Sequence, residues 1–502
     1  MLNFPTVLLR KTLPAAFVAL ALGTMSGCSS SDGPEPVSRM LDTEAMSKIR
    51  LNAINRVWDA VEAGEVDHQQ AREMLKRVAW SRSTYWSTRT AAIDALMKDT
   101  DHLEDTRAMF ALLVPTEKVV EVLEKIGEIS VRREWTNVAP SFVRAWDRNT
   151  QEVRIDEDRP EPAVLRAMFP DQTLAQTLFE VFQGKYQDGP GVRFGERDRR
   201  AAWGLLVRTA ESEDEITELV RKAEIGARND DPLMWAIAAA ANRFRAVPQT
   251  AEQVAWIERL LTDTKNLDFV SEAERVVEVL PESARQGWQL RHLAPAVWAS
   301  RFEPSLLTRS RSELISMVDA MLSSRETHFR DRTDTAWLGG ESLDEWKDKL
   351  AWGDALALLI AARSVEDASR SLADLHTEIF RQADADNADT STEYGGLLFA
   401  AAGGNLTAQL FEPRANSRYG DERFVASQEL IDAADTALFM YHFHVTRTRN
   451  ADYAGPSFDD FEFVRREGRA SLLYTFVTQD RLNVDYYQPG GLRIDLGTIE
   501  RP

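Results

Sequence analysis

Two histidines separated by one residue are the feature of this sequence whose chemistry is most readily stated. His442 and His444 lie in the run from Thr436 to Val445, whose alternation predicts a strand with both imidazoles on one face. Two imidazoles so placed can chelate one divalent ion. The chain has 7 His in all, so this spacing is informative, although two polar residues at a strand end would give the same pattern without a metal.

Carboxylates that could complete such a site lie on both sides of the pair. Ser457 and Asp460 stand at the spacing that caps and opens a helix, which would place Asp460 in the first turn as a third ligand. Glu393 lies upstream, shortly before Gly395 and Gly396 and a strand-like run. The two glycines permit close backbone approach, and a carboxylate at this position could act as a base.

The order of these residues resembles the JAMM metalloprotease family, also called the MPN domain. The resemblance covers about residues 391 to 497. It implies an α+β domain of that family holding one zinc ion. By that resemblance, His442, His444 and Asp460 would be the zinc ligands, Glu393 the general acid/base, and Ser457 the donor that steadies the oxyanion.

Two departures from the family pattern leave the activity open. The residue between the histidines is Phe443, where the family prefers Ser or Thr. Twelve residues separate His444 from Ser457, which is a longer loop than the family has. Because JAMM-fold domains without activity are common, a domain that keeps the fold and serves only for binding is the alternative.

The elements that must position these residues are predicted to be short strands interrupted by two helices. Glycines and strand-like runs become frequent after residue 390, and we expect a mixed domain at residues 386–502. The predicted strands are Leu397–Ala400, Leu406–Phe411, Ala437–Val445, Leu472–Val477, Leu482–Tyr487 and Leu492–Leu496. The predicted helices are Val425–Ala434 and Phe458–Arg466.

The preceding residues, 41–385, show helical periodicity in one segment after another. Ile54, Val57, Trp58 and Val61 form one apolar stripe, ended by Gly64. Thr250 and Gln253 stand at capping-box spacing before another. No strict repeat is evident, so the sequence predicts an irregular α-solenoid. All 13 Trp lie at or before Trp352, and packing between helices explains them better than a carbohydrate-binding platform.

The N-terminus has the features of an export signal. Arg10 and Lys11 precede an apolar run that is too short to span a bilayer, and residues 25–28 read Met-Ser-Gly-Cys. This run resembles the lipobox of bacterial lipoproteins, although Met25 stands where Leu is usual. The resemblance implies a signal peptide at residues 1–27, lipidation of Cys28, and a flexible tether at residues 28–40. Ser29 favours the outer membrane, because Asp there commonly retains such lipoproteins at the inner membrane.

Charge and composition limit the classes of molecule that this chain is expected to bind. The formal charge of −20 disfavours binding to nucleic acid or to an anionic lipid surface, so the membrane contact should be the lipid alone. The leading hypothesis is a membrane-tethered zinc peptide or isopeptide hydrolase of the cell envelope, whose helical region binds a protein or peptide. The alternative is a non-catalytic envelope scaffold or binding lipoprotein.

Overall fold

The computed structural model describes residues 37–148, 159–186, 195–210, 213–223, 226, 228–326, 328, 346–366 and 370–502. The predicted signal peptide, Cys28 and most of the tether lie outside the described residues. Two compact units divide the chain, one ending at Ala95 and one beginning at Leu96. None of the described helices is long and apolar enough to cross a bilayer.

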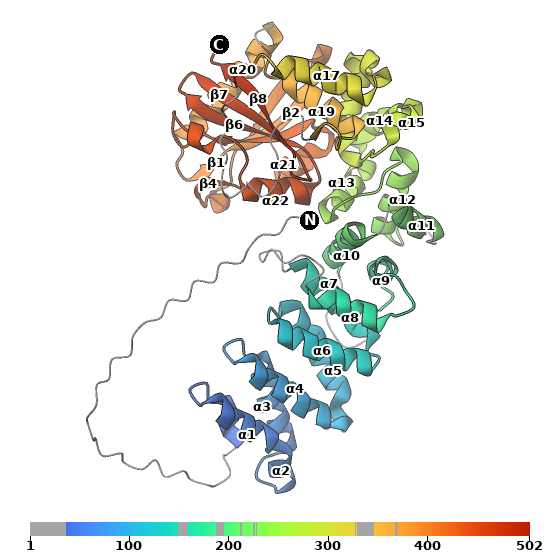
Figure 1. Ribbon diagram of the computed structural model, residues 1–502, viewed down its shortest axis with the longest axis vertical. Helices are drawn as coiled ribbons and strands as arrows, with labels where there is room; N and C mark the ends of the chain where they lie inside the picture. The colour runs from blue at the N-terminus through green and yellow to red at the C-terminus, as the bar shows by residue number, and fades with distance from the viewer. Residues whose placement is uncertain are drawn as a thin grey trace, which may run out of the picture. The chain divides into compact units, whose positions relative to one another are not determined.

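The predicted fold class is confirmed: a mostly helical region precedes a mixed α/β region with a six-stranded sheet (Figure 1). The first unit contains a 3-10 helix, Val37–Leu41, followed by α1 (Ser47–Asn55), α2 (Val57–Glu62), α3 (His68–Trp80) and most of α4 (Trp86–Lys98). Val37 and Met40 are buried, so packed structure begins three residues before the predicted end of the tether. The stripe from Ile54 to Val61 is split between α1 and α2 at Arg56, and Gly64 follows α2 with a φ of 73°.

The helices of the second unit form an array without a fixed repeat. They are α5 (Leu103–Leu113), α6 (Val120–Arg132), α7 (Ala139–Arg148), α8 (Pro160–Met168), α9 (Leu174–Phe182), α10 (Glu196–Thr209), α11 (Glu213–Lys222), α12 (Pro232–Phe244), α13 (Ala251–Thr262), α14 (Leu267–Val279), α15 (Glu282–Arg285), α16 (Leu293–Phe302), α17 (Arg311–Leu322), α19 (Trp352–Arg363) and α20 (Arg370–Asn387). Trp146, Trp203 and Trp352 are fully buried among them, as expected of packing residues.

The α/β region follows α20 and contains the predicted strands and helices within about two residues, except that α21 begins three residues later and β8 ends four residues later than predicted. Its elements are β1 (Thr392–Glu393), β2 (Gly395–Ala400), β3 (Leu406–Phe411), β4 (Gly420–Phe424), α21 (Gln428–Ala433), β5 (Phe439–His444), α22 (Phe458–Glu467), β6 (Ser471–Thr478), β7 (Arg481–Tyr487) and β8 (Arg493–Glu500). The six-stranded sheet has the order β3-β2-β5-β6-β7-β8, in which only β5 and β6 are parallel. Two short strands, β1 and β4, were not predicted, and they pair with each other.

The two faces of this sheet are covered by different elements. Phe439, Tyr441 and Phe443 project into a large core shared with helices from α12 to α20. Met440, on the opposite face of β5, packs with Leu430 of α21. The composition change near residue 386 therefore marks a change of secondary structure, while the hydrophobic core continues across it.

Helix α13 ties the helical array to the ends of α21 and α22. Thr250 caps α13 by accepting a hydrogen bond from Gln253 N at 3.1 Å. The predicted reciprocal bond from the Gln253 side chain to Thr250 is not formed, because that side chain donates to Gly468 O at 2.7 Å and accepts from Gln249 N at 2.7 Å. Trp256 Nε1 donates to Asp435 O at 3.0 Å. The bonds to Gly468 and Asp435 hold the C-terminal ends of α22 and α21 against the helical region.

Candidate metal centre

The histidine pair lies at the C-terminal end of β5, between β2 and β6. Gly395 of β2 pairs with His442, and the pairing extends one step further because Phe443 N donates to Tyr394 O at 3.2 Å. This extension brings Glu393 beside the histidines. A Cβ at Gly395 would lie 2.6 Å from Tyr441 O, so the close approach of β2 to β5 requires glycine there.

Three of the predicted residues form a cluster that could hold a metal ion. Glu393, His442 and His444 each offer one ligand atom, and these atoms all lie within 4.8 Å of one another. The three residues are 7%, 3% and 9% exposed. A buried set of one carboxylate and two imidazoles has the donor types that zinc prefers.

Asp460 contacts both histidines. Its Oδ1 lies 3.1 Å from His442 Nε2, and its Oδ2 lies 3.7 Å from His444 Nε2. Burial raises the pKa of the Asp460 carboxyl, yet the two imidazoles and the Ser457 backbone N–H outweigh burial and hold that pKa well below its usual range. Asp460 is therefore an anion at neutral pH and can act as a ligand.

One nitrogen atom of this cluster is buried without a hydrogen-bond partner among the described residues. His442 Nε2 is buried and, among the described residues, has no hydrogen bond of suitable geometry, although Asp460 is near it. The Phe424 ring covers the imidazole in a stacked arrangement, with centroids 5.3 Å apart and planes 13° apart. A buried nitrogen without a hydrogen bond is costly, and a cation would satisfy it.

The long loop between β5 and α22 orients the second imidazole. His444 Nδ1 lies 3.1 Å from Tyr453 O, and since a carbonyl can only accept, this bond places the proton of the neutral imidazole on Nδ1 and leaves Nε2 unprotonated, as a metal ligand must be. Asn450 fixes the same loop by donating to His444 O at 3.1 Å. Asp485 of β7 accepts from Gly455 N at 3.1 Å. The loop that is longer than in the JAMM pattern thus contains Tyr453, whose carbonyl accepts the hydrogen bond from His444.

Ser457 opens α22, as its spacing to Asp460 predicted. Its backbone N–H donates to Asp460 Oδ2 at 2.6 Å, and its hydroxyl oxygen accepts from Asp460 N at 3.3 Å. This capping box fixes the carboxylate toward the histidines. All five predicted side chains line one groove of about 2020 Å³, which we call the site groove.

Sequence reasoning missed the residues that support the cluster. Phe424 and Asp485 lie 18 and 41 residues from the nearest histidine, and nothing local in the sequence marks them. Asn450 and Tyr453 lie in the loop that was recognised as unusually long, and this length was the available signal.

Comparison with protein-family models, curated protein sequences and solved structures gave no match to this chain. The likeness to JAMM metalloproteases therefore rests on the order of the residues in the sequence.

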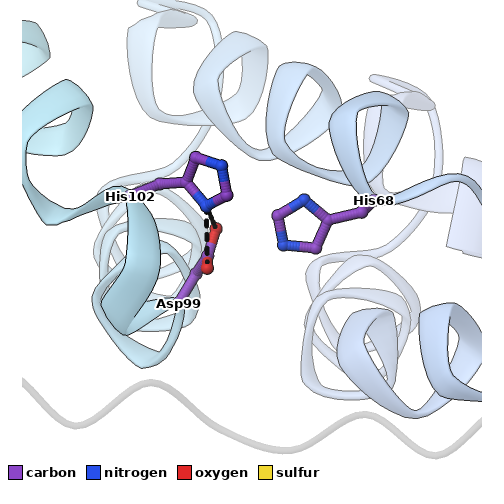
Figure 2. A group of neighbouring side chains, drawn as sticks. All are labelled: His68, Asp99 and His102. Atoms are coloured by element: carbon purple, nitrogen blue, oxygen red, sulfur yellow. Dashed lines mark hydrogen bonds and ion pairs between the residues drawn. The ribbon is translucent and has the colours of Figure 1, made fainter.

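Three histidines elsewhere in the described chain have a nearby acceptor from the protein. His102 Nδ1 lies 3.1 Å from Asp99 Oδ2 just before α5, and the imidazole of this pair is half-exposed while the carboxylate is nearly buried (Figure 2). His292 is buried, with its Nε2 2.9 Å from Asp354 Oδ1. His376 Nε2 lies 2.9 Å from Ser364 O. The expectation that single histidines in the helical region are not metal ligands stays a prediction.

Proposed function

We propose that this chain is a zinc-dependent hydrolase of peptide or isopeptide bonds. The observation that carries the proposal is the convergence of Glu393, His442, His444 and Asp460 in one groove, with His442 Nε2 buried and without a hydrogen bond. This is the residue set that the JAMM resemblance implies, brought together from β1, β5 and α22.

The donor set fits a zinc ion held by His442, His444 and Asp460. When bound at three protein ligands, zinc supplies Lewis acidity toward a substrate carbonyl and toward water. The hydrogen bond from His444 Nδ1 to Tyr453 O selects the tautomer in which the opposite nitrogen carries no proton, as ligation requires. For His442, ligation requires the proton on Nδ1, which lies 3.4 Å from Tyr487 Oη.

Proton transfer and stabilisation of the oxyanion would be carried out by side chains of the protein. Glu393, whose Oε1 lies 3.8 Å from His444 Nε2, would accept a proton from the attacking water and deliver it to the leaving amine. The Ser457 hydroxyl oxygen accepts one backbone bond, and among the described residues no acceptor takes its proton. That proton would be donated to the oxyanion that forms from the substrate carbonyl.

The size of the site groove favours a polypeptide substrate. At about 2020 Å³ the groove exceeds the 300–1,000 Å³ that is typical of small-molecule pockets. Helices α10 and α13 line it together with β4 and α22, so the helical array contributes directly to the binding surface.

The alternative is a binding lipoprotein whose α/β region has no catalytic role. The 3.1 Å approach of His442 Nε2 to Asp460 Oδ1 favours it, because a protonated His442 would form a structural ion pair there without a metal. The two functions differ in what the cluster holds at neutral pH.

Metal analysis of the purified chain tests the proposal. We expect close to one zinc per chain, lost in a His442→Ala/His444→Ala variant. Glu393→Gln should retain zinc and lose hydrolysis of a peptide library, while the parent cleaves it. Absence of zinc from the parent after zinc is supplied would refute the proposal and favour the binding lipoprotein.

The membrane attachment needs a separate experiment. We propose that lipid on Cys28 anchors the chain in the bacterial envelope, as the likeness of residues 25–28 to a lipobox implies. Metabolic labelling with a palmitate analogue should mark the parent and not Cys28→Ser. Equal labelling of both chains would refute the anchor.

A further inference from the structure

The charge of the site groove differs from that of the chain. The sequence has 80 Asp and Glu against 60 Lys and Arg. The groove is instead lined by eight arginines and seven carboxylates, and two of those carboxylates, Glu393 and Asp460, belong to the candidate metal centre. The lining is therefore nearly balanced in charge, whereas the chain as a whole is acidic.

Several of these arginines are already engaged within the protein. Arg200 lies 3.0 Å from Glu258, Arg291 lies 2.9 Å from Asp354, and Arg465 is paired with Glu462. Their charges are compensated by carboxylates of the protein, so these arginines stabilise the walls of the groove.

Arg197, Arg423 and Arg447 are different. Among the described side chains none of them has a carboxylate within ion-pair distance, and the Arg423 guanidinium lies 5.7 Å from the centre of the Tyr419 ring. All three are exposed and line the groove.

Their positions relate them to the metal centre. Arg423 directly precedes Phe424, whose ring stacks on His442. Arg447 follows His444 by three residues, and Arg197 lies in the first turn of α10, on the helical part of the lining. Cationic side chains thus reach the groove from three separate elements around one site.

We propose that the site groove selects acidic polypeptide segments, with aspartate or glutamate side chains of the substrate bound by Arg423 and Arg447 beside the cleaved bond. The inference rests on the proposed function and names its substrate class. The guanidinium fork matches a carboxylate with two parallel hydrogen bonds, which gives specificity as well as affinity.

A polypeptide fits the groove better than a nucleic acid does. The seven carboxylates on its walls would repel a continuous polyanion, whereas a peptide can place single carboxylates at the free arginines and uncharged residues elsewhere. The net charge of the chain adds to that repulsion.

Peptide binding tests the inference independently of hydrolysis. The full chain carrying Glu393→Gln is titrated with two fluorescent peptides of equal length, one with glutamates and one with glutamines at the same positions. We expect about tenfold tighter binding of the glutamate peptide, weakened by added salt, and loss of this preference in an Arg423→Gln/Arg447→Gln variant. Arg449→Gln is the matched control, because Arg449 is exposed on the same loop and does not line the groove. It should keep the preference.

Three results would overturn the inference. They are equal affinity for both peptides, a preference that survives the double substitution, and displacement of the glutamate peptide by a single-stranded oligonucleotide of equal charge at lower concentration. Failure of the proposed function is recognised separately, as a parent chain that binds no zinc or cleaves no peptide.

Discussion

Substitution of Gly395 by alanine tests whether close packing of β2 on β5 shapes the metal centre. A Cβ at this position would lie 2.3 Å from Phe424 Cε2 and 2.6 Å from Tyr441 O. The phenyl ring can turn away, but the carbonyl belongs to the neighbouring strand and can retreat only if the β2–β5 pairing opens. Overpacking of this kind costs about 1–3 kcal/mol, and we expect a value near the middle of that range, about 2 kcal/mol.

The same substitution should weaken metal binding. Displacing the Phe424 ring removes its stacking on His442, and loss of an outer contact to a ligand typically lowers metal affinity about tenfold or more. Urea denaturation of the metal-free chain would measure the stability, and competition with a chromophoric chelator would measure zinc affinity.

Gly204→Ala is the matched control for this experiment. Its Cβ would meet only Ala251 N at 3.5 Å, an ordinary contact, and Gly204 lies inside α10. Alanine should therefore stabilise the helix by up to about 1 kcal/mol and leave zinc affinity unchanged. If Gly395→Ala matched the parent in both stability and zinc affinity, the argument from close packing would be wrong.

Three further predictions concern the loop, the metal and pH. Asn450→Ala removes the bond to His444 O and should weaken zinc binding about tenfold in the same chelator competition; unchanged affinity would show that the loop does not position His444. Removing zinc with a chelator should lower the thermal midpoint, and added zinc should restore it, since a ligand at 100 times its Kd stabilises by about 2.7 kcal/mol. Burial, with Glu467 beside it, raises the pKa of Glu252 to about 7, so the stability contributed by this carboxyl is present at acidic pH and lost as pH rises through 7. Glu252→Gln should therefore be more stable than the parent at pH 8 and equal to it near pH 4. The expected difference at pH 8 is about 1 kcal/mol, because the Glu252 side chain is 38% exposed and solvent weakens the effect. Equal stability of the two chains at pH 8 would contradict this prediction.

Local sequence patterns were sufficient for the parts of this fold that depend on local interactions. The alternation in β5 correctly placed Met440 and Phe439 on opposite faces, because successive side chains of a strand point to opposite sides of the sheet. The spacing of Ser457 and Asp460 correctly predicted the first turn of α22, because both partners of a capping box lie within one helical turn.

Long-range contacts could not be predicted in this way. The stacking of Phe424 on His442 depends on β4 reaching β1, and β4 contains Gly420 and three charged residues with no alternating apolar pattern. Gln253 has the sequence position of a capping residue, yet its side chain serves a contact 215 residues away at Gly468. In both cases tertiary packing determines which residues are in contact, and the pattern of one sequence does not identify contacts between distant residues.

The hydrophobic core that runs from α12 to β8 has a practical consequence for dissecting this protein. A fragment that begins at residue 386 would carry the whole candidate centre but would leave Phe439, Tyr441, Tyr474 and Tyr486 facing water. Such a fragment should self-associate through that exposed sheet face. Fragments intended for biochemistry should therefore begin before α12, and a protease that cuts near residue 386 should leave two pieces that stay bound to each other.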